Sequence, residues 1–354
     1  MYSDRDHYSD EHRRFLNDIA KSYWNTATHE ERRERYGTHV DRFEMVDVPD
    51  QADIYVLTMK WPHYVDNNLV DLALRALDTA RRARKPFVMF SVGDSPANFP
   101  VSGNDIHVFE SSGYQSRRRT RVHGMPPFFD DPLDAACGGT VRVRDKQTKA
   151  QIGFCGQAGS SLPRHAARAM RVQLRKAQWR LGRVQWEPTP LEHTWFRQRV
   201  LETFERSPAV ETHYVLRTKY RAGIATSENR NSLAEQSRRE FFENVLENDY
   251  TLCMRGGGNF SVRFYEALAL GRIPIFIDTD CLVPYHDRVD WQRYIPWIDA
   301  RDLADAPQVV ADFHARLSPA EFRELQLACR QLWVERLSPD GFYAHFAEHF
   351  EARS

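Results

Sequence analysis

Short apolar runs alternate with amphipathic stretches along the first third of the chain. The runs are rich in β-branched and aromatic residues, which predicts strands, and the stretches between them place apolar residues at helical spacing. Lys85-Pro86 ends one of these helices directly before a strand. Strands are expected over residues 53–59, 87–92 and 106–109, and helices over residues 10–23 and 69–84. Strand–helix–strand alternation of this kind predicts a parallel sheet in an α/β domain.

A change of pattern over residues 125–144 divides the chain. Prolines and glycines interrupt every periodicity there, which is typical of a linker. Because 354 residues exceed the roughly 250–300 at which a single core stops growing, two domains are expected. Beyond the linker, a strand is expected over residues 151–156, and helices over residues 165–180, 237–247 and 319–351 with a break at 338–341. We place an N-terminal domain at residues 1–148, a C-terminal domain at residues 149–335, and a final helix at residues 336–354, expected to return to the first domain.

The most informative pattern is a strand–loop–helix–strand unit. Strands are expected over residues 250–254 and 272–278, with an apolar helix over residues 260–270 between them. Arg255 and three glycines follow the first strand directly. Asn259 is a good N-cap for the helix, and Gly271 stands where a helix-ending glycine belongs.

This unit has the parts of a nucleotide-diphosphate site. Glycines let a backbone approach a ligand closely, and a helix N-terminus offers free N–H groups and a positive dipole end. Arg255 and Arg263 flank that end with cationic donors, and Glu266 lies about one turn deeper, where a carboxylate can accept hydrogen bonds from a ribose diol. The predicted donor-binding residues are Arg255, Gly256, Gly257, Gly258, Asn259, Ser261, Arg263 and Glu266, with Gly156 meeting the diphosphate from across the cleft. The alternative interpretation is a simple glycine turn, with Glu266 solvated or paired only with Arg263.

Composition narrows the class of protein. Lys+Arg and Asp+Glu are both 49, which argues against a globally basic nucleic-acid-binding protein but leaves room for a local basic groove. Five cysteines without a C-x-x-C pair argue against a disulfide framework or a cysteine zinc site and favour a reducing compartment. The N-terminus is polar and no apolar run reaches about 20 residues. We therefore expect a cytoplasmic protein, at most peripheral at the inner face of the plasma membrane.

Residues 252–291 resemble the exostosin family of glycosyltransferases. The motifs that carry the resemblance are Leu252-Cys253-Met254-Arg255-Gly256, Arg263-Phe264-Tyr265-Glu266-Ala267-Leu268, Gly271-Arg272-Ile273-Pro274-Ile275, Leu282-Val283-Pro284-Tyr285 and Asp290-Trp291. Met254 departs from the family pattern, which has proline there, and residues 151–156 show a weaker likeness to the strand that opens the family's second domain. The resemblance implies an α/β fold of GT-B type, with two facing Rossmann-like domains and a cleft between them.

The resemblance also implies an activity. It is the inverting transfer of a hexosyl or pentosyl group from a nucleotide-diphosphate donor, expected to be a UDP-sugar, to a hydroxyl of a glycan or lipid-linked glycan acceptor. The expected setting is cell-surface polysaccharide synthesis. No cofactor and no divalent metal are expected, and no nucleic-acid partner; the oligomeric state is left open.

An inverting transfer needs a base for the acceptor hydroxyl and a group that stabilises the leaving diphosphate. Arg255, Arg263 and the loop amides take the second task, and Glu266 holds the nucleotide by analogy with GT-B enzymes. Asp94, directly after the strand at residues 87–92, is the first candidate for the base, with His63 and His123 as alternatives. Gly-Asp-Ser-Pro is also an ordinary turn sequence, and either histidine can equally be a loop or packing residue.

Three further alternatives stay open. Asp278-Thr279-Asp280 spells the Asp-x-Asp motif that chelates Mn²⁺ in another glycosyltransferase fold, although a metal role is not expected here. The arginines of residues 164–180 form a solvated helix face or a site for an anionic acceptor or lipid diphosphate. At the level of function, the competing classes are a sugar-nucleotide 2-epimerase of GT-B fold and a non-catalytic nucleotide- or glycan-binding subunit.

Overall fold

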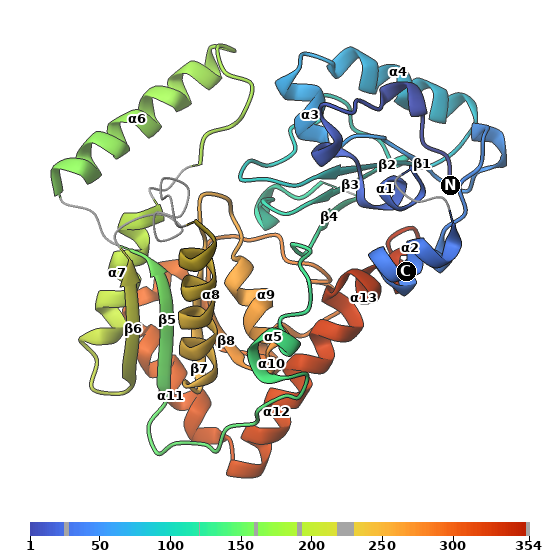
Figure 1. Cartoon of the computed structure of the whole chain (residues 1–354). Helices are drawn as coiled ribbons and strands as arrows, with labels where there is room; N and C mark the ends of the chain where they lie inside the picture. The colour runs from blue at the N-terminus through green and yellow to red at the C-terminus, as the bar shows by residue number, and fades with distance from the viewer. Residues whose placement is uncertain (25–27, 120, 159–161, 190–192, 218–229, 352–354) are drawn as a thin grey trace.

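Two parallel β-sheets, one in each half of the chain, form the framework of the molecule (Figure 1). The computed structural model describes residues 1–24, 28–119, 121–158, 162–189, 193–217 and 230–351. All strand pairings within these two sheets are parallel. The expectation of an α/β fold with a parallel sheet in each of two domains is confirmed.

The N-terminal sheet has four strands in the order β1-β2-β3-β4. They are β1 (Tyr55–Val56), β2 (Phe87–Ser91), β3 (Ile106–Glu110) and β4 (Val122–Gly124). The helices of this half are α1 (Asp18–Trp24), α2 (His29–Tyr36), α3 (Trp61–Asp66) and α4 (Val70–Arg82). β2 and β3 are buried along their whole length, although β3 carries His107 and Glu110 among its apolar residues.

The N-terminal segment corrects two predicted boundaries. Asn17 Oδ1 accepts a hydrogen bond from Ala20 N at 2.7 Å, so the helix expected from residue 10 begins at Asp18. The side-chain amide of Asn17 donates to Leu57 O at 3.0 Å and Thr58 O at 2.9 Å. These carbonyls therefore bond to a neighbouring segment, and the strand expected over residues 53–59 is reduced to β1.

The C-terminal sheet has five strands in the order β6-β5-β7-β8-β9. They are β5 (Gln151–Gln157), β6 (Glu211–Arg217), β7 (Tyr250–Met254), β8 (Ile273–Asp278) and β9 (Trp297–Asp299). The helices after β4 are α5 (Leu133–Cys137), which lies within the expected linker, α6 (Leu162–Arg180), α7 (His193–Glu205), α8 (Arg230–Leu246), α9 (Val262–Ala269), α10 (Trp291–Tyr294), α11 (Ala306–Arg316), α12 (Pro319–Leu332) and α13 (Pro339–Ala344). β7 is buried throughout, whereas β6 is an edge strand with partly exposed residues.

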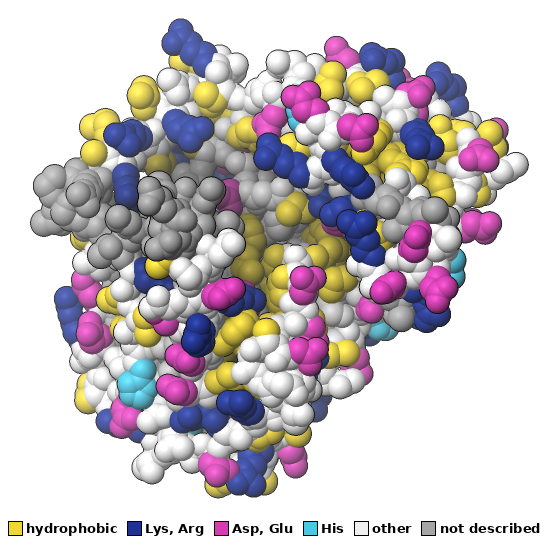
Figure 2. Space-filling view, in the orientation of Figure 1, with side chains coloured by type: hydrophobic (Ala, Val, Ile, Leu, Met, Phe, Trp, Pro, Cys, Tyr) yellow, Lys and Arg dark blue, Asp and Glu magenta, His cyan; other side chains and the backbone are white. Residues whose placement is uncertain are grey.

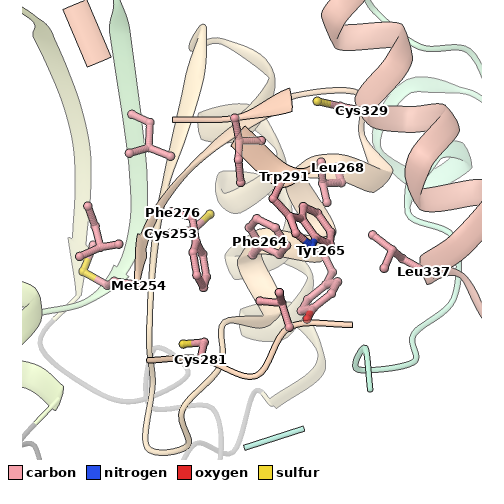
Figure 3. Packing of buried hydrophobic residues seen from close by; sticks show 14 of the residues in the cluster. Cys253, Met254, Phe264, Tyr265, Leu268, Phe276, Cys281, Trp291, Cys329 and Leu337 are labelled. Carbon is pink, nitrogen blue, oxygen red and sulfur yellow. The ribbon is translucent and has the colours of Figure 1, made fainter. Parts of the chain in front are cut away.

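The core of this half forms around α9, which is buried on nearly all sides. Phe264 packs against Phe276 of β8 and Trp291 of α10, with ring centroids 4.9 and 5.3 Å apart (Figure 3). Because α9 must fit between the sheet and the C-terminal helices, its sequence is apolar around most of its circumference. The N-cap is Ser261 without a side-chain capping bond, so the prediction of Asn259 as N-cap is wrong.

The C-terminal segment lies against the N-terminal sheet. Phe346 stacks on Phe90 and Phe109 with ring centroids 6.3 and 5.0 Å apart, and Phe350 lies 4.3 Å from the His107 ring. The C-terminus accordingly appears beside α2 and α13 in Figure 1. In the described part of the chain, no helix combines the length and the apolar character that a bilayer crossing requires.

Candidate functional site

The glycine loop after β7 lies directly against the N-terminal domain. A Cβ built on Gly257 would be 2.7 Å from Asp94 Oδ2, and one on Gly258 would be 2.5 Å from Ser112 Oγ and 2.9 Å from Asp94 Cα. Side chains at these two positions would push the domains apart. The structure thus brings Asp94 to the predicted donor loop, and it adds a reason for the glycines: close approach of the other domain. Figure 2 shows the molecular surface hollowed at this boundary.

Arg255 is buried behind the loop, with 1% of its surface exposed. Its Nη1 donates to Asn259 Oδ1 at 3.2 Å, and its Nη2 donates to Thr189 Oγ1 at 2.5 Å and Gly257 O at 3.2 Å. The third donor, Nε, is buried and has no acceptor among the described residues. A buried cationic N–H without a partner is costly, so an oxygen anion at this position would be bound strongly.

Arg263 belongs to α9, and its guanidinium reaches the end of β5. Its Nη2 donates to Cys155 O at 2.7 Å, and its guanidinium stacks 4.4 Å above the Phe154 ring. A Cβ on Gly156 would be 2.6 Å from Arg263 Nη2, so glycine is needed there to admit the guanidinium. As with Arg255, Nε of Arg263 is buried without an acceptor in the described part of the chain.

Glu266 is 9% exposed on the inner side of α9 and forms an ion pair with Arg238 of α8. The alternative in which Glu266 pairs only with Arg263 is therefore wrong. Arg238 also lies 4.3 Å above the Phe242 ring, which fixes its guanidinium beside the carboxylate. Arg238 carries no local sequence signal for this role, because only the fold brings its side chain in α8 within reach of Glu266 in α9.

Arg197 of α7 is a second cation that the sequence analysis missed. Its Nε donates to Arg255 O and its Nη1 donates to Gln157 O, both at 3.2 Å. It therefore joins the ends of β5 and β7 beside the glycine loop. The loop also closes on itself, because Gly256 N donates to Phe260 O at 3.1 Å. The Gly256 amide is consequently used within the loop.

Asn259 holds the two domains together. Its side-chain amide donates to Gly113 O at 3.1 Å in the N-terminal domain and to Asp280 O at 3.0 Å, and its Oδ1 accepts from Thr279 Oγ1 at 2.7 Å. The neighbouring segments are also paired, with Gln115 N donating to Asp280 O at 3.0 Å. The side chain of Asn259 thus serves the domain contact directly beneath the loop.

Replacing Asn259 with alanine should lower the free energy of unfolding by about 1–3 kcal/mol, because buried carbonyl groups lose their donor. Urea unfolding followed by circular dichroism measures this change. Asn231→Ala, at an exposed position of α8, is the matched control and should change stability by less than about 0.5 kcal/mol. Equal effects of the two substitutions would contradict the bridging role.

The two candidate histidines lie inside the N-terminal domain. His63 is 2% exposed in α3, with its ring 5.0 Å from that of His12, and burial lowers its pKa. His123 is 5% exposed in β4 and stacks on Phe109 and His107, with ring centroids 4.8 and 5.5 Å apart. Neither ring is among the groups that meet the glycine loop, whereas Asp94 is.

Glu110 is a carboxylate that the sequence analysis did not single out. It ends β3, is 6% exposed, and its Oε2 accepts a hydrogen bond from Ala97 N at 2.6 Å. Burial raises the pKa of Glu110 to about 7. The signal in the sequence was an acidic residue at the end of an apolar strand, where α/β sheets place ligand-binding groups.

A cavity of about 540 Å³ lies beside Glu110. Tyr114, Arg117 and Arg119 line it from the N-terminal domain, and Trp179 lines it from α6. Tyr114 belongs to the segment that pairs with Cys281 across the domain boundary. The cavity therefore lies near the domain boundary, with a buried carboxyl group, cationic side chains and an aromatic ring available to a polar ligand.

The Asp-x-Asp motif serves the domain contact in this structure. Asp278 Oδ1 accepts from Cys281 N at 2.8 Å and Oδ2 from Trp297 Nε1 at 3.1 Å, while Asp280 accepts from Ser116 N at 2.8 Å. Across the described ranges there is no group of three or more histidine, cysteine or acidic side chains arranged to hold a metal ion. Both aspartates thus have structural partners.

Comparisons with known proteins give local sequence similarity and distant structural likeness. No family model matches the chain. A stretch of 107 residues is 32% identical to Exostosin-1 of Drosophila melanogaster, covering 28% of this chain and 14% of that protein. The chain thus spans only a small part of the length of this relative.

Two solved structures are similar to this chain at low identity. One is a point mutant of S. aureus TarM in complex with fondaparinux, alpha-GlcNAc-glycerol and UDP, with a TM-score of 0.38 and 9% identity over 84% of this chain and 55% of that one. The other is a glycosyltransferase from Rickettsia africae, with a TM-score of 0.38 and 8% identity over 99% of this chain and 96% of that one.

Proposed function

We propose that the protein is an inverting glycosyltransferase that moves a sugar from a nucleoside-diphosphate donor, in the first place a UDP-sugar, to a hydroxyl group of a glycan or lipid-linked glycan. The observation that carries the proposal is the pair of arginines at the glycine loop, each with a buried Nε. Arg255 and Arg263 each keep a buried Nε without an acceptor among the described residues, on either side of the α9 N-terminus. A diphosphate supplies oxygen anions for two such donors.

The position of Glu266 suits contact with the ribose of a nucleotide. Glu266 lies one turn further along α9 than Arg263 and is buried beside Arg238. A carboxylate at this depth can accept hydrogen bonds from a ribose diol while the phosphates remain at the loop. The local identity to Exostosin-1 supports the broader proposal of a glycosyltransferase.

The proposed reaction uses groups from both domains. The acceptor oxygen attacks the anomeric carbon, the bond from that carbon to the phosphate oxygen breaks, and the diphosphate leaves with the electron pair. Arg255 and Arg263 stabilise the charge that develops on it. The hydroxyl proton passes to a carboxylate of the N-terminal domain. Glu110 is our first candidate for this base because its raised pKa suits proton transfer near neutrality, and Asp94 is the alternative.

Replacing Glu266 with glutamine should weaken UDP binding about tenfold to a hundredfold, because the ribose loses a charged acceptor. Isothermal titration of the purified protein with UDP measures this. Glu243→Gln, at an exposed carboxylate of α8, is the matched control and should leave the affinity unchanged.

Arg238→Gln separates binding from structure, because it removes the ion pair and keeps the Glu266 carboxylate. We expect UDP affinity to stay within about threefold of the wild type for this variant. If it falls as far as in Glu266→Gln, the carboxylate acts by holding α8 against α9, and the ribose assignment fails.

Activity is tested over a panel of nucleotide sugars with and without a chelator, using glycan acceptors. Transfer that survives the chelator supports the proposal, and the absence of binding to any nucleotide overturns it. A new free sugar nucleotide formed without acceptor would instead indicate a 2-epimerase. Tight UDP binding without turnover on any acceptor would indicate a non-catalytic subunit.

A further inference from the structure

We propose that α6 is a membrane-docking element that binds the surface of a bilayer containing anionic lipids. The proposal goes beyond the donor site and does not depend on it. α6 lies apart from both sheets in Figure 1, and neither the glycine loop nor the core explains its sequence.

All charged residues of α6 and of the segments beside it are basic. The chain has no net charge, yet no acidic residue occurs between Asp145 and Glu187. The basic residues within and directly after α6 are Arg164, Arg168, Arg171, Arg175, Lys176, Arg180 and Arg183. A helix that is merely solvated usually mixes both signs of charge, whereas attraction to an anionic surface requires one sign.

An apolar stripe runs along the exposed side of α6. Met170, Leu174 and Leu181 have 72%, 58% and 69% of their surface exposed. Their spacing of four and seven residues places them on one side of the helix, and Leu181 continues the helical pattern because its N–H donates to Ala177 O at 3.1 Å. A stripe of three large apolar side chains in water is unfavourable unless another apolar phase covers it.

Arginines flank this stripe. Arg171 and Arg175 lie along one side and Arg180 along the other, all exposed. None of the three has an ion-pair partner in the described ranges. Figure 2 shows the resulting mixture of hydrophobic and basic side chains at the upper left, over the place of α6 in Figure 1.

The two features together identify the occupant. A soluble polyanion would satisfy the arginines and leave the apolar stripe in water, and an apolar protein groove would leave the arginines without counter-charges. An anionic bilayer offers phosphates at its surface and acyl chains directly below, which matches an apolar stripe between basic borders.

The opposite side of α6 leads to the cleft. Trp179 lines the cavity beside Glu110, and Trp186 Nε1 donates to Asp66 Oδ1 at 2.7 Å on the N-terminal domain. Ser95 Oγ, next to Asp94, donates to Glu187 O at 3.4 Å. Docking through α6 would therefore hold the cavity near the lipid headgroups. The idea that this cavity receives an acceptor rests on the proposed function.

The test is co-sedimentation of the full chain with vesicles of phosphatidylcholine alone and of phosphatidylcholine mixed with phosphatidylglycerol. Binding to the mixed vesicles should be at least about tenfold tighter, and salt should weaken it. The charge variant R171Q/R175Q/R180Q should bind them about a hundredfold more weakly. The apolar variant M170S/L174S/L181S should lose binding at high salt as well as at low salt.

Matched controls come from exposed positions elsewhere. V309S/L327S removes exposed apolar side chains from α11 and α12, and R239Q/R293Q removes exposed charges from α8 and α10. Both should bind vesicles like the wild type, and circular dichroism of all variants verifies that they are folded.

Several outcomes would overturn the proposal. They are equal binding to both vesicle types, no binding to either, or full binding by the apolar variant. Loss of self-association in M170S/L174S/L181S by analytical ultracentrifugation, without vesicle binding in the wild type, would assign the stripe to a protein interface. Heparin binding that needs the arginines but not the stripe, without vesicle binding, would assign the helix to a soluble polyanion.

Discussion

Replacing Glu110 with glutamine should reduce sugar transfer by about 10³-fold while stabilising the folded protein at alkaline pH. The loss of turnover follows because glutamine cannot take the proton of the acceptor hydroxyl. The gain in stability follows because glutamine keeps an acceptor for Ala97 N and avoids a buried negative charge. A purely structural residue at this position would not produce both effects.

The raised pKa of Glu110 determines how its contribution to the stability of the protein changes with pH. Burial raises the pKa of Glu110 from 4.5 to about 7, so the folded state binds more protons than the unfolded state between these values. The contribution of Glu110 to stability is full below pH 4.5 and is lost as the pH rises through about 7. The loss amounts to about 1.4 kcal/mol per pH unit, or roughly 3 kcal/mol in total.

Urea unfolding at pH 5 and pH 8 compares the wild type with Glu110→Gln. The variant should gain stability relative to the wild type at pH 8 but much less at pH 5. Transfer by the wild type should rise with pH through about 7. Asp94→Asn is the companion variant: if it abolishes transfer while Glu110→Gln retains it, Asp94 is the base and our first assignment is wrong.

Replacing Gly124 with alanine should lower the free energy of unfolding by about 3 kcal/mol and loosen the contact between the domains. A Cβ there would lie 2.5 Å from Val283 C and 2.6 Å from Leu282 O, which are backbone atoms that no rotamer change can move. β4 would have to shift away from the segment after β8. Because that segment supports Asn259 and the glycine loop, UDP binding should weaken as well.

Gly256→Ala is the control for this substitution. Its Cβ would meet only Arg197 Nη2, at 3.4 Å, which is ordinary contact. Urea unfolding should therefore change by less than about 1 kcal/mol for Gly256→Ala. An unfolding midpoint of Gly124→Ala equal to that of the wild type would show that the domain contact adapts to the added methyl group.

Strands could be predicted from the sequence where an apolar run is compatible with only one kind of secondary structure. Apolar runs predicted β2 and β7 nearly to the residue, because strands buried on both faces need no contribution from neighbours to be recognised. Boundaries failed where a side chain from elsewhere took over the backbone groups. Asn17 shortened β1 in this way, and Asn259 joined the domain contact instead of capping α9.

The sequence by itself determined the unit that holds the candidate donor site. Strand, glycines, Arg255, Arg263 and Glu266 are close along the chain, so helix periodicity alone places them at one helix end. Only the tertiary structure decided which side chains from other parts of the chain lie near this unit. Packing brings side chains to this region from elements that are far apart in the sequence, namely Asp94, Glu110, Arg197 and Arg238. The spacing of residues within one helix or strand cannot predict such contacts.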